Sequence, residues 1–465
     1  MSEVPRGWGS AKLKDLVELR TGPFGSSLHR SDYVEGGIPV VNPMHIEGGR
    51  IRPSSKHRVS EKTAARLSEF RLSPGDVILG RRGEMGRCAV AQADQAGWLC
   101  GTGSLIARPG EAITSCFLQG LLSSDSVVKY LTAESVGTTM VNLNQRILLD
   151  LDVMVPPVPE QTRIVEKLEE LLSDLDIGVA ELKAAQRKLA QYRQSLLKAA
   201  VEGTLTADWR ATHGVSTESD VKLPTDWAIK SVEQVGDVQL GRQRAPQFHS
   251  GDNMVPYLRV ANVFENRIEI SDVKEMHFSQ DEEERFRLRS GDILLNEGQS
   301  LELVGRPAIY RDELARACFT NTLVRFRAKP ELLPEYALTV FLHYMHSGRF
   351  QKIAKITTNI AHLGAGRFAA LEFSLPPVAE QAEIIAVLGA QLAIVDEQRV
   401  AVMHGLNQAA AQRKNLLKAA FSGQLVPQDP NDEPASALLA RIRASRESGT
   451  ANHATKRGRK AKEKT

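Results

Sequence analysis

Cysteine is scarce in this chain of 465 residues, which contains only Cys88, Cys100, Cys116 and Cys318. Neighbouring cysteines are 12, 16 and 202 positions apart, so no CxxC pair occurs. This spacing argues against a zinc knuckle and against a disulfide framework, and it favours a reducing cytoplasmic location.

Long apolar runs are also missing. No run approaches the ~20 residues of a membrane span, and residues 1–10 have neither the basic start nor the apolar segment of an export signal. The content of hydrophobic residues (42%) and of charged residues (25%) is that of a soluble globular protein. We therefore expect two or three soluble domains, because 465 residues exceed what one core holds.

Catalytic motifs are absent as well. The sequence has no GxxxxGK[ST], HExxH or GxSxG, and Gly101-Thr-Gly103 lacks a third glycine at the right spacing. Val155 and Leu375 precede the two Pro-Pro pairs, which excludes the (Asn/Asp)-Pro-Pro-(Tyr/Phe) motif of amino-methyltransferases. His343 and His346 could share a helical face and bind a metal, but no third ligand is evident, so we predict neither a catalytic residue nor a metal site.

The net charge of +3 is unevenly distributed. Residues 456–465 hold six Lys or Arg and one Glu, which leaves 53 basic and 55 acidic residues in the rest of the chain. We expect this short tail to be disordered, either as a nonspecific polyanion contact or without a role. Any nucleic-acid surface must then come from local arrangement of charges.

The most informative feature is an internal repeat. Residues 156–176 recur as residues 376–396 with nine of 21 positions identical, and residues 195–205 recur as 415–425 with seven of 11 identical, both at an offset of 220. Weaker matches keep the same order: Pro5–Trp8 with Pro224–Trp227, Ile38-Pro39 with Val255-Pro256, Ser73–Leu79 with Arg289–Leu295, and Thr138-Thr139 with Thr357-Thr358. The chain is a duplication with two similar and two divergent segments.

The similar segments are predicted to be long helices. Apolar residues recur every seven positions with polar flanks, which is the pattern of a coiled coil, and Gly203 and Gly423 follow as C-caps. Either the two helices pack against each other antiparallel, or each binds an outside partner; their equal length and register favour mutual packing. The predicted interface residues are Glu160, Gln161, Leu168, Leu175, Leu182, Leu189, Leu196, Glu380, Gln381, Leu388, Val395, Val402 and Leu416.

The divergent segments are predicted to be mixed α/β (α+β) domains. Short β-rich runs bounded by glycines alternate with apolar helical spacing at 115–131 and 334–353. The expected organisation is a pseudo-two-fold repeat, with domains at 1–155 and 224–375, spacer helices at 156–205 and 376–425, a linker at 206–223, and a C-terminal segment at 426–465. The acidic run 281–284 is expected to be solvated.

Basic and amide side chains gather at predicted turns of both domains. Arginine can bond phosphates or guanine edges through its planar fork, and Asn and Gln can bond adenine edges twice. An ordinary surface charge is the alternative for each arginine. The candidate DNA-binding residues are Arg50, Arg52, Arg81, Arg82, Arg87, Arg242, Arg244, Asn296, Gln299 and Arg306.

With these features the chain resembles the specificity subunits of type I restriction–modification systems. The likeness rests on the repeated Pro-Pro-x-x-Glu-Gln at 156–161 and 376–381, the Leu-Leu-Lys-Ala-Ala helix ends, Gly22–Ser27, Pro74–Ile78 followed by Arg81-Arg82-Gly83, Asn321–Arg327 and Asp432–Pro434. The resemblance implies two target-recognition domains, each of which binds one half of an asymmetric split site in double-stranded DNA. It also implies that the helices set the spacer and dock two modification methyltransferase subunits, which a translocating restriction subunit joins.

The resemblance further implies that this chain binds no cofactor itself, since S-adenosylmethionine, ATP and Mg belong to the partner subunits. Two alternatives remain at this stage. One is a specificity subunit of another restriction–modification class, in which cleavage brackets the site; the other is a coiled-coil scaffold that binds protein and no DNA.

Overall fold

The computed structural model describes residues 4–23, 26–134, 143, 145–213, 223–357 and 359–447. The chain divides into two compact units: unit 1 comprises Met1–Glu181 with Gly405–Thr465, and unit 2 comprises Leu182–His404. Thr138-Thr139, Thr358, part of Gly22–Ser27 and the basic tail lie outside the described residues.

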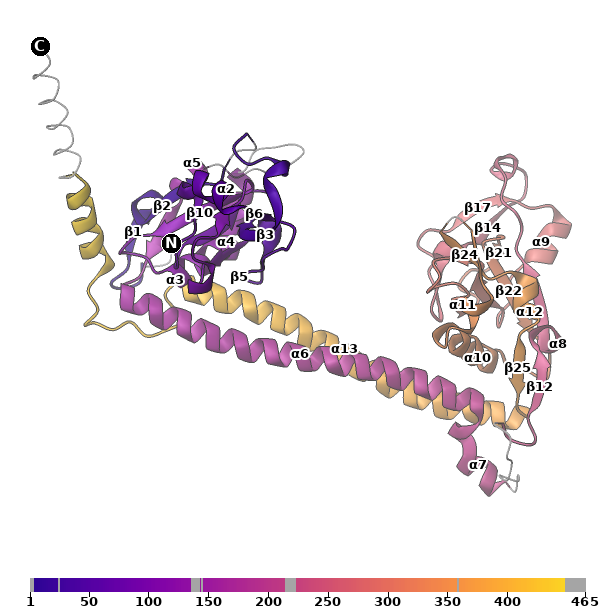
Figure 1. Cartoon of the computed structure of the whole chain (residues 1–465). Helices are drawn as coiled ribbons and strands as arrows, with labels where there is room; N and C mark the ends of the chain where they lie inside the picture. The colour runs from indigo at the N-terminus through magenta and orange to yellow at the C-terminus, as the bar shows by residue number, and fades with distance from the viewer. Residues whose placement is uncertain are drawn as a thin grey trace, which may run out of the picture. The chain divides into compact units, whose positions relative to one another are not determined.

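A four-stranded antiparallel sheet forms the centre of unit 1 (Figure 1). Its order is β2 (Val17–Thr21), β10 (Ser104–Pro109), β7 (Val77–Gly80) and β8 (Cys88–Val90). Successive side chains of a strand point to opposite faces. Val77 and Leu79 accordingly join the core under α3 (Ser115–Leu122), whereas Ile78 joins a separate core on the other face. Both faces are covered, which explains the continuous apolar run in β7.

Smaller sheets surround this centre in unit 1. They are β6 (Arg58–Val59) with β3 (Tyr33–Val41) and β9 (Leu99–Cys100), the hairpin β4 (Ile46–Glu47) with β5 (Arg50–Ile51), and the pair β1 (Gly9–Lys12) with β11 (Asp152–Val155). Helix α4 (Asp125–Glu134) follows α3, so the predicted helical segment 115–131 is two helices.

The sheets described for unit 1 recur in unit 2 in the same order. Its central sheet is β13 (Gly236–Leu240), β22 (Leu323–Ala328), β18 (Ile293–Asn296) and β20 (Pro307–Ile309). Around it lie β17 (Lys274–His277) with β14 (Met254–Leu258) and β21 (Cys318–Phe319), the hairpin β15 (Val263–Phe264) with β16 (Arg267–Ile268), and β12 (Ala228–Ser231) with β25 (Glu372–Leu375). Unit 2 also contains α10 (Pro334–His346), α11 (Arg349–Ile353), and a small sheet of β19 (Gly298–Gln299), β24 (Ile360–His362) and β23 (Lys355–Thr357).

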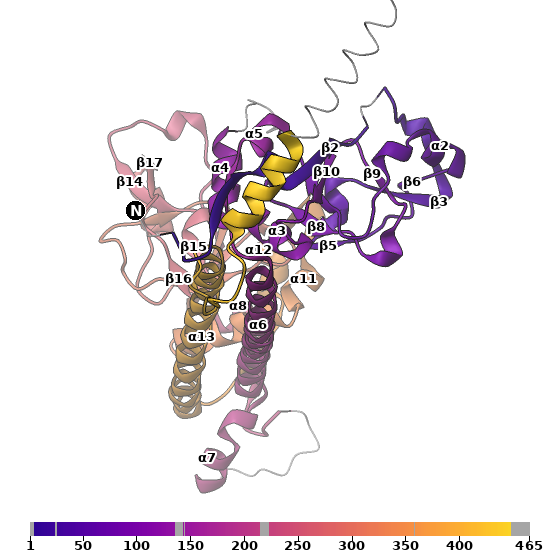
Figure 2. The same ribbon diagram turned by 90° about the vertical axis from the view of Figure 1, so that its left-hand side faces the viewer.

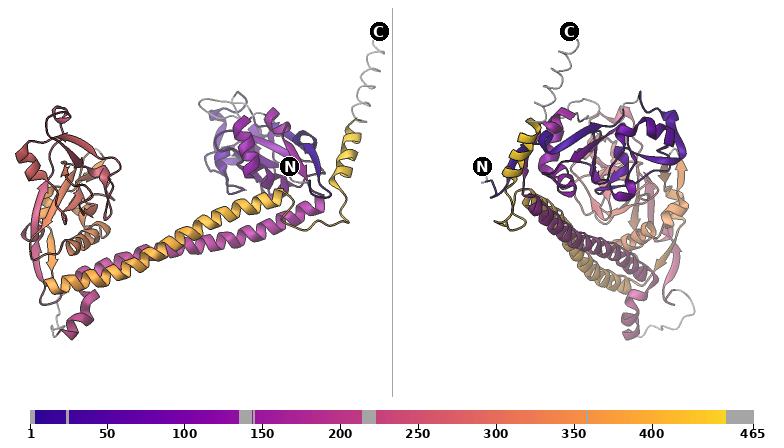
Figure 3. Two further views of the ribbon diagram at one scale, coloured as in Figure 1. Left: turned by 180° about the vertical axis from the view of Figure 1, so that it is seen from behind. Right: turned by 60° about the vertical axis from the view of Figure 1, so that its left-hand side comes forward.

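Each unit contains one segment of each of two long helices. These are α6 (Val158–Glu202) and α13 (Val378–Phe421), each about 65 Å long at 1.5 Å per residue. Gly203 (φ 80°) and Gly423 (φ 73°) follow their ends in the left-handed conformation that favours glycine, as the sequence predicts. Within each unit the two helical segments lie side by side (Figure 3).

Contacts within the units join α6 to α13. In unit 1, Asp176 forms an ion pair with Arg413. In unit 2, Tyr192 Oη lies 3.5 Å from Gln391 Oε1, and Gln186 Nε2 lies 3.4 Å from Met403 Sδ. Among the predicted interface leucines and valines, Leu168, Leu196, Leu388 and Val395 are buried, and Leu175, Leu182, Leu189, Val402 and Leu416 are half-buried.

The C-terminal segment returns to the N-terminal strand of unit 1. A helix over residues 435–447 follows Pro434 and lies beside β1 (Figure 2). Ala435 N donates a hydrogen bond to Gly7 O (2.8 Å), and Arg163 Nη2 binds Asp432 Oδ2 at 2.6 Å. Leu439 is buried in the main core of this unit.

One expectation about a segment between domains needs correction. The interval 206–223, expected to be a linker, begins with helix α7 (Ala207–Thr212), whose Arg210 is buried. Helix α13 is also long and apolar enough to cross a membrane by length and composition, with a mean hydropathy of 1.6 in its best window. Its apolar face instead packs in the core of unit 2, through Ile384, Leu388 and Val395.

Candidate nucleic-acid interface

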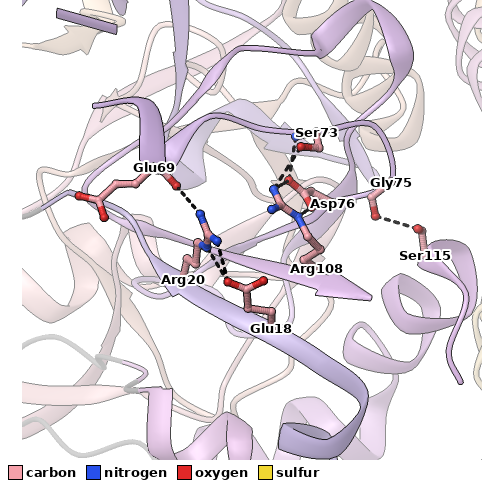
Figure 4. A network of polar contacts seen from close by, with 8 residues as sticks. All are labelled: Glu18, Arg20, Glu69, Ser73, Gly75, Asp76, Arg108 and Ser115. Atoms are coloured by element: carbon pink, nitrogen blue, oxygen red, sulfur yellow. Dashed lines mark hydrogen bonds and ion pairs between the residues drawn. The ribbon is translucent and has the colours of Figure 1, made fainter. Parts of the chain in front are cut away.

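The repeated Gly-Asp turns hold the central sheets together. Asp76, which is 1% exposed, accepts a two-pronged bond from Arg108 (2.7 and 2.8 Å) and a bond from Ser73 N at 2.8 Å (Figure 4). In unit 2, Asp292 accepts the same bonds from Arg327 (2.6 and 2.7 Å) and Arg289 N (2.8 Å). Paired guanidinium–carboxylate bonds of this geometry are strong and directional. This repeated motif is therefore structural, and Arg327 is occupied within the protein.

The second repeated motif, Pro-Pro-x-x-Glu-Gln, attaches each long helix to its own domain. Glu160 Oε1 accepts from Trp8 Nε1 at 2.9 Å, and Glu380 Oε2 accepts from Trp227 Nε1 at 2.7 Å. Gln161 bonds Thr114 N and Ala112 O, both at 2.8 Å. These glutamates and glutamines, predicted as interface residues, are all buried at the junction of helix and domain.

Gln381 repeats the pattern in unit 2, where it bonds Leu333 N (2.8 Å) and Glu331 O (2.9 Å). The surroundings of the two glutamates nevertheless differ. Glu380 also accepts from Thr206 Oγ1 (2.7 Å) and forms an ion pair with Arg210. Burial raises the pKa of Glu160, and the Trp8 bond opposes only part of that shift.

In unit 1 the structure brings the predicted arginines to two neighbouring loops. Arg50 and Arg52 lie on and just after β5, and Arg81, Arg82 and Arg87 lie around the turn at Gly83 and Gly86. A groove of about 890 Å³ lies between this turn and the β4–β5 hairpin. Both loops therefore border one surface.

The five arginines of unit 1 differ in how far they are free to bind a ligand. Arg52 pairs with Glu47 (3.0 Å), and Arg87 pairs with Glu84 (2.5 Å). Burial lowers the pKa of Arg81, and neighbouring Arg82 lowers it further. The Arg81 Nε is buried and has no hydrogen-bond partner among the residues that the structure describes. Arg50 and Arg82 are exposed, and within the described ranges no carboxylate pairs with either, which makes them the strongest candidates for phosphate or base contacts.

Two of the predicted contacts in unit 2 are buried instead. Arg242 is 6% exposed, bonds Glu282 at 2.8 Å and lies 3.8 Å from the Phe248 ring centroid. Asn296 is fully buried, and its Nδ2 reaches Val263 O at 3.5 Å. Neither side chain can reach a base edge in this conformation. Both were predicted as contacts because the sequence alone does not separate a polar side chain on the surface from one bonded in the interior.

The acidic run 281–284 supplies the carboxylates that pair with buried or half-exposed arginines of unit 2. It lies in helix α9 (Gln280–Phe286) and is not simply solvated, because Glu282 pairs with Arg242 and Glu283 pairs with Arg316. The remaining candidates of unit 2 are Arg244, Gln299 and Arg306. Arg244 is exposed, and its Cζ lies 5.6 Å from the centroid of the Tyr257 ring, whereas Gln299 and Arg306 are half-buried.

One cationic residue was missed. Arg267 lies on the β15–β16 hairpin at the position that Arg50 occupies on β4–β5, and it is 60% exposed. Extending the match of Ile38-Pro39 with Val255-Pro256 by the same offset of 217 residues would have found it.

The described residues offer no catalytic machinery. No group of three His, Cys, Asp or Glu within them could hold a metal ion. Burial raises the pKa of Cys88 to about 11 and that of Cys318 to about 12, so neither thiol is an activated nucleophile. His346 bonds Glu265 at 3.2 Å and is used within the fold.

A family profile and curated relatives match this chain over most of its length. The profile of the type I restriction modification DNA specificity domain matches residues 5–184 and 224–399. The chain is 25% identical over 462 residues to the type I restriction enzyme EcoKI specificity subunit of Escherichia coli K12, with 96% of both chains covered. It is 24% identical over 463 residues to the StySPI specificity subunit of Salmonella potsdam, again with 96% of each chain covered.

Solved structures share the fold. A chain from a study of complex assembly in a type I restriction–modification system has a TM-score of 0.69 at 20% identity, covering 91% of this chain and 100% of that chain. The HsdS subunit from Thermoanaerobacter tengcongensis has a TM-score of 0.54 at 19% identity, covering 91% and 98%.

Two α/β domains joined to long helices, with arginine-bearing loops and a family match over both domains, define a class of DNA-targeting proteins. The chain belongs to the type I restriction–modification DNA specificity family, which confirms the resemblance found in the sequence. It is a specificity subunit, and its function is DNA recognition. Such subunits bind DNA and assemble with methyltransferase and restriction subunits.

Proposed function

We propose that each domain recognises one half of an asymmetric, bipartite site in double-stranded DNA. The carrying observation is the contrast between the two domains: the repeated residues are buried and structural, whereas the exposed cationic loops differ. Asp76 and Asp292 are bonded alike, but at the equivalent hairpin position Arg50 has no carboxylate partner within the described ranges, whereas Arg267 pairs with Glu269 at 2.8 Å. Two domains with the same scaffold but different exposed side chains are suited to bind two different DNA half-sites.

We propose further that α6 and α13 form an antiparallel coiled coil that sets the distance between the half-sites, with the two domains related by a pseudo-two-fold axis. Residues further along α6 contact residues earlier in α13, which is the order expected of antiparallel helices. Asp176 meets Arg413 in unit 1, and Gln186 meets Met403 in unit 2. The apolar seven-residue spacing supports the same pairing.

Catalysis belongs to partner subunits in this proposal. Two methyltransferase subunits dock on the helices and bind S-adenosylmethionine, and restriction subunits bind ATP and Mg. This chain binds no cofactor and works in the cytoplasm. The burial of the apolar face of α13 in the core of unit 2 supports a soluble chain.

Domain exchange tests the proposal. The chain is expressed with its methyltransferase subunits, and the methylated sequences are read by single-molecule sequencing. Replacing residues 1–155 with those of another specificity subunit should change one half-site and leave the other and the gap unchanged. Replacing residues 224–375 is the matched control and should change only the other half. A methylated sequence that neither exchange alters would contradict DNA recognition by these domains and would favour a scaffold.

A further inference from the structure

The β15–β16 hairpin of unit 2 carries an aromatic ring between two cationic side chains. The guanidinium carbons of Arg267 and Arg306 each lie 4.8 Å from the centroid of the Phe264 ring. Contacts at this distance between a guanidinium group and a ring are favourable and hold the planar cation in place. Phe264 is thus a platform for two arginines from different segments of the domain.

The two arginines are neutralised differently. Arg267 pairs with Glu269 on the same hairpin at 2.8 Å, in an exposed position. The Arg306 Nε is buried without a hydrogen-bond partner, and no ion pair to Arg306 occurs in the part of the chain that the structure describes. In unit 1 the corresponding arginine follows Gly86, as Arg306 follows Gly305, and it is Arg87, paired with Glu84 at 2.5 Å. Within the described residues Arg306 therefore lacks the ion pair that its counterpart Arg87 makes.

The hairpin is fastened to two helices through its turn. Glu265 Oε1 accepts from Arg193 Nη2 of α6 at 2.9 Å and from His346 Nε2 of α10 at 3.2 Å. The next residue, Asn266, has a φ of 48°, and its Oδ1 accepts from Arg311 Nη2 at 3.0 Å. In unit 1 the positions of Glu265 and Asn266 are taken by Gly48 and Gly49, which can form no such side-chain bonds.

We propose that Arg306, stacked on Phe264, binds a backbone phosphate of the second half-site, and that Glu265 is a positioning residue that holds this hairpin against the spacer helix. This inference rests on the proposed DNA recognition and deepens it. A planar guanidinium is suited to a phosphate, because two parallel N–H groups can bond two oxygens. Glu265 contributes a negative charge beside the DNA, so its benefit is positional.

Two opposite electrostatic expectations make the proposal testable. The affinity falls as salt rises, so the slope of log K against log salt is negative. Loss of a phosphate-binding charge reduces the magnitude of this slope by about one, because about one counterion fewer is released. Loss of an acidic side chain near DNA by itself strengthens binding. If Glu265 positions the hairpin, Glu265→Gln weakens binding although the protein becomes less acidic.

The experiment uses the complex of this chain with its methyltransferase subunits and a duplex that carries the site found in its own methylome. Salt-dependent affinities are measured for wild type, Arg306→Gln, Arg306→Lys, Glu265→Gln and Arg193→Gln. We expect Arg306→Gln to reduce the magnitude of the salt slope by about one, and Arg306→Lys to leave the slope unchanged. We expect Glu265→Gln and Arg193→Gln each to weaken binding about threefold to tenfold, and their combination to weaken it no more than either alone.

Glu269→Gln is the matched control. It removes the same charge from the same hairpin without touching α6 or α10, and it should leave affinity unchanged or raise it. An unchanged slope for Arg306→Gln would overturn the phosphate assignment, and tighter binding by Glu265→Gln would overturn the positioning role. A wild-type complex with no bipartite methylated site would instead refute the proposed function. Thermal unfolding of each variant identifies any loss that is due to folding.

Discussion

The sharpest stability prediction concerns the buried ion pair at the head of α13. Arg210 and Glu380 have side chains that are 7% and 0% exposed, and Glu380 also accepts bonds from Thr206 and Trp227. Arg210→Ala leaves this carboxylate without its counter-ion in a site that excludes water. Removing one partner of a buried pair costs about 3–5 kcal/mol, because the other charge stays buried.

Unit 1 offers an internal comparison. Its ion pair next to the equivalent glutamate joins Arg163 and Asp432, whose side chains are 35% and 10% exposed. Solvent screens this pair, so Arg163→Ala should cost about 1 kcal/mol or less. The two substitutions remove the same kind of side chain, and they differ in burial.

Hydrogen exchange measured by mass spectrometry can assign each loss to its unit. Arg210→Ala should accelerate exchange around Trp227 and the first turns of α13 by about a hundredfold or more, since 1.4 kcal/mol corresponds to a factor of ten. Arg210→Met with Glu380→Met should recover much of the loss, because an apolar pair needs no counter-ion. A loss below about 1 kcal/mol for Arg210→Ala would refute the reasoning.

Two further predictions follow from the exposed loops and from one shifted carboxyl group. Arg82→Ala should relax the first half-site alone and Gln299→Ala the second alone, as judged by methylome sequencing; equal loss at every site would indicate folding damage. The hydrogen bond from Arg316 is the largest cause that lowers the pKa of Glu283, to about 2, and Asn253 contributes next. Because the folded pKa is depressed, the stabilisation by Glu283 is complete above its unfolded pKa of about 4.5 and disappears as the pH falls towards 2. Denaturant unfolding of wild type and Glu283→Gln should therefore differ at pH 7 and converge near pH 2, and a difference independent of pH would contradict this assignment.

The repeat made much of the fold predictable from the sequence. Two matches at one offset located α6 and α13, and Gly203 and Gly423, which lie within the second match, mark where the helices end. Short β-rich runs located strands such as β7 and β18, because a strand buried on both faces is apolar throughout. Helix α7 was missed because a short polar helix has no apolar periodicity, and its Arg210 is buried by an ion pair from a distant segment.

The candidate site was less predictable, for a physical reason. The chemistry of arginine is the same whether its partner is a phosphate or a carboxylate, and only the fold decides which one is near. Arg242 forms an ion pair with Glu282, 40 positions away, whereas no carboxylate pairs with Arg82 in the described ranges. The repeat itself held an unused signal, because residues identical in both halves, such as Glu160 and Glu380, serve the shared scaffold.

The measurement that tests the central claim most directly is the length of the unrecognised gap. Seven residues are inserted into α6 after Gln186 and seven into α13 after Met403. Because Gln186 and Met403 face each other, the two insertions lie opposite one another and the helices stay in register. Seven helical residues add about 10 Å, or about three base pairs of duplex. We predict the same two half-sites with a gap longer by about three base pairs. Efficient methylation with the original gap would contradict the account that these helices measure the distance between half-sites.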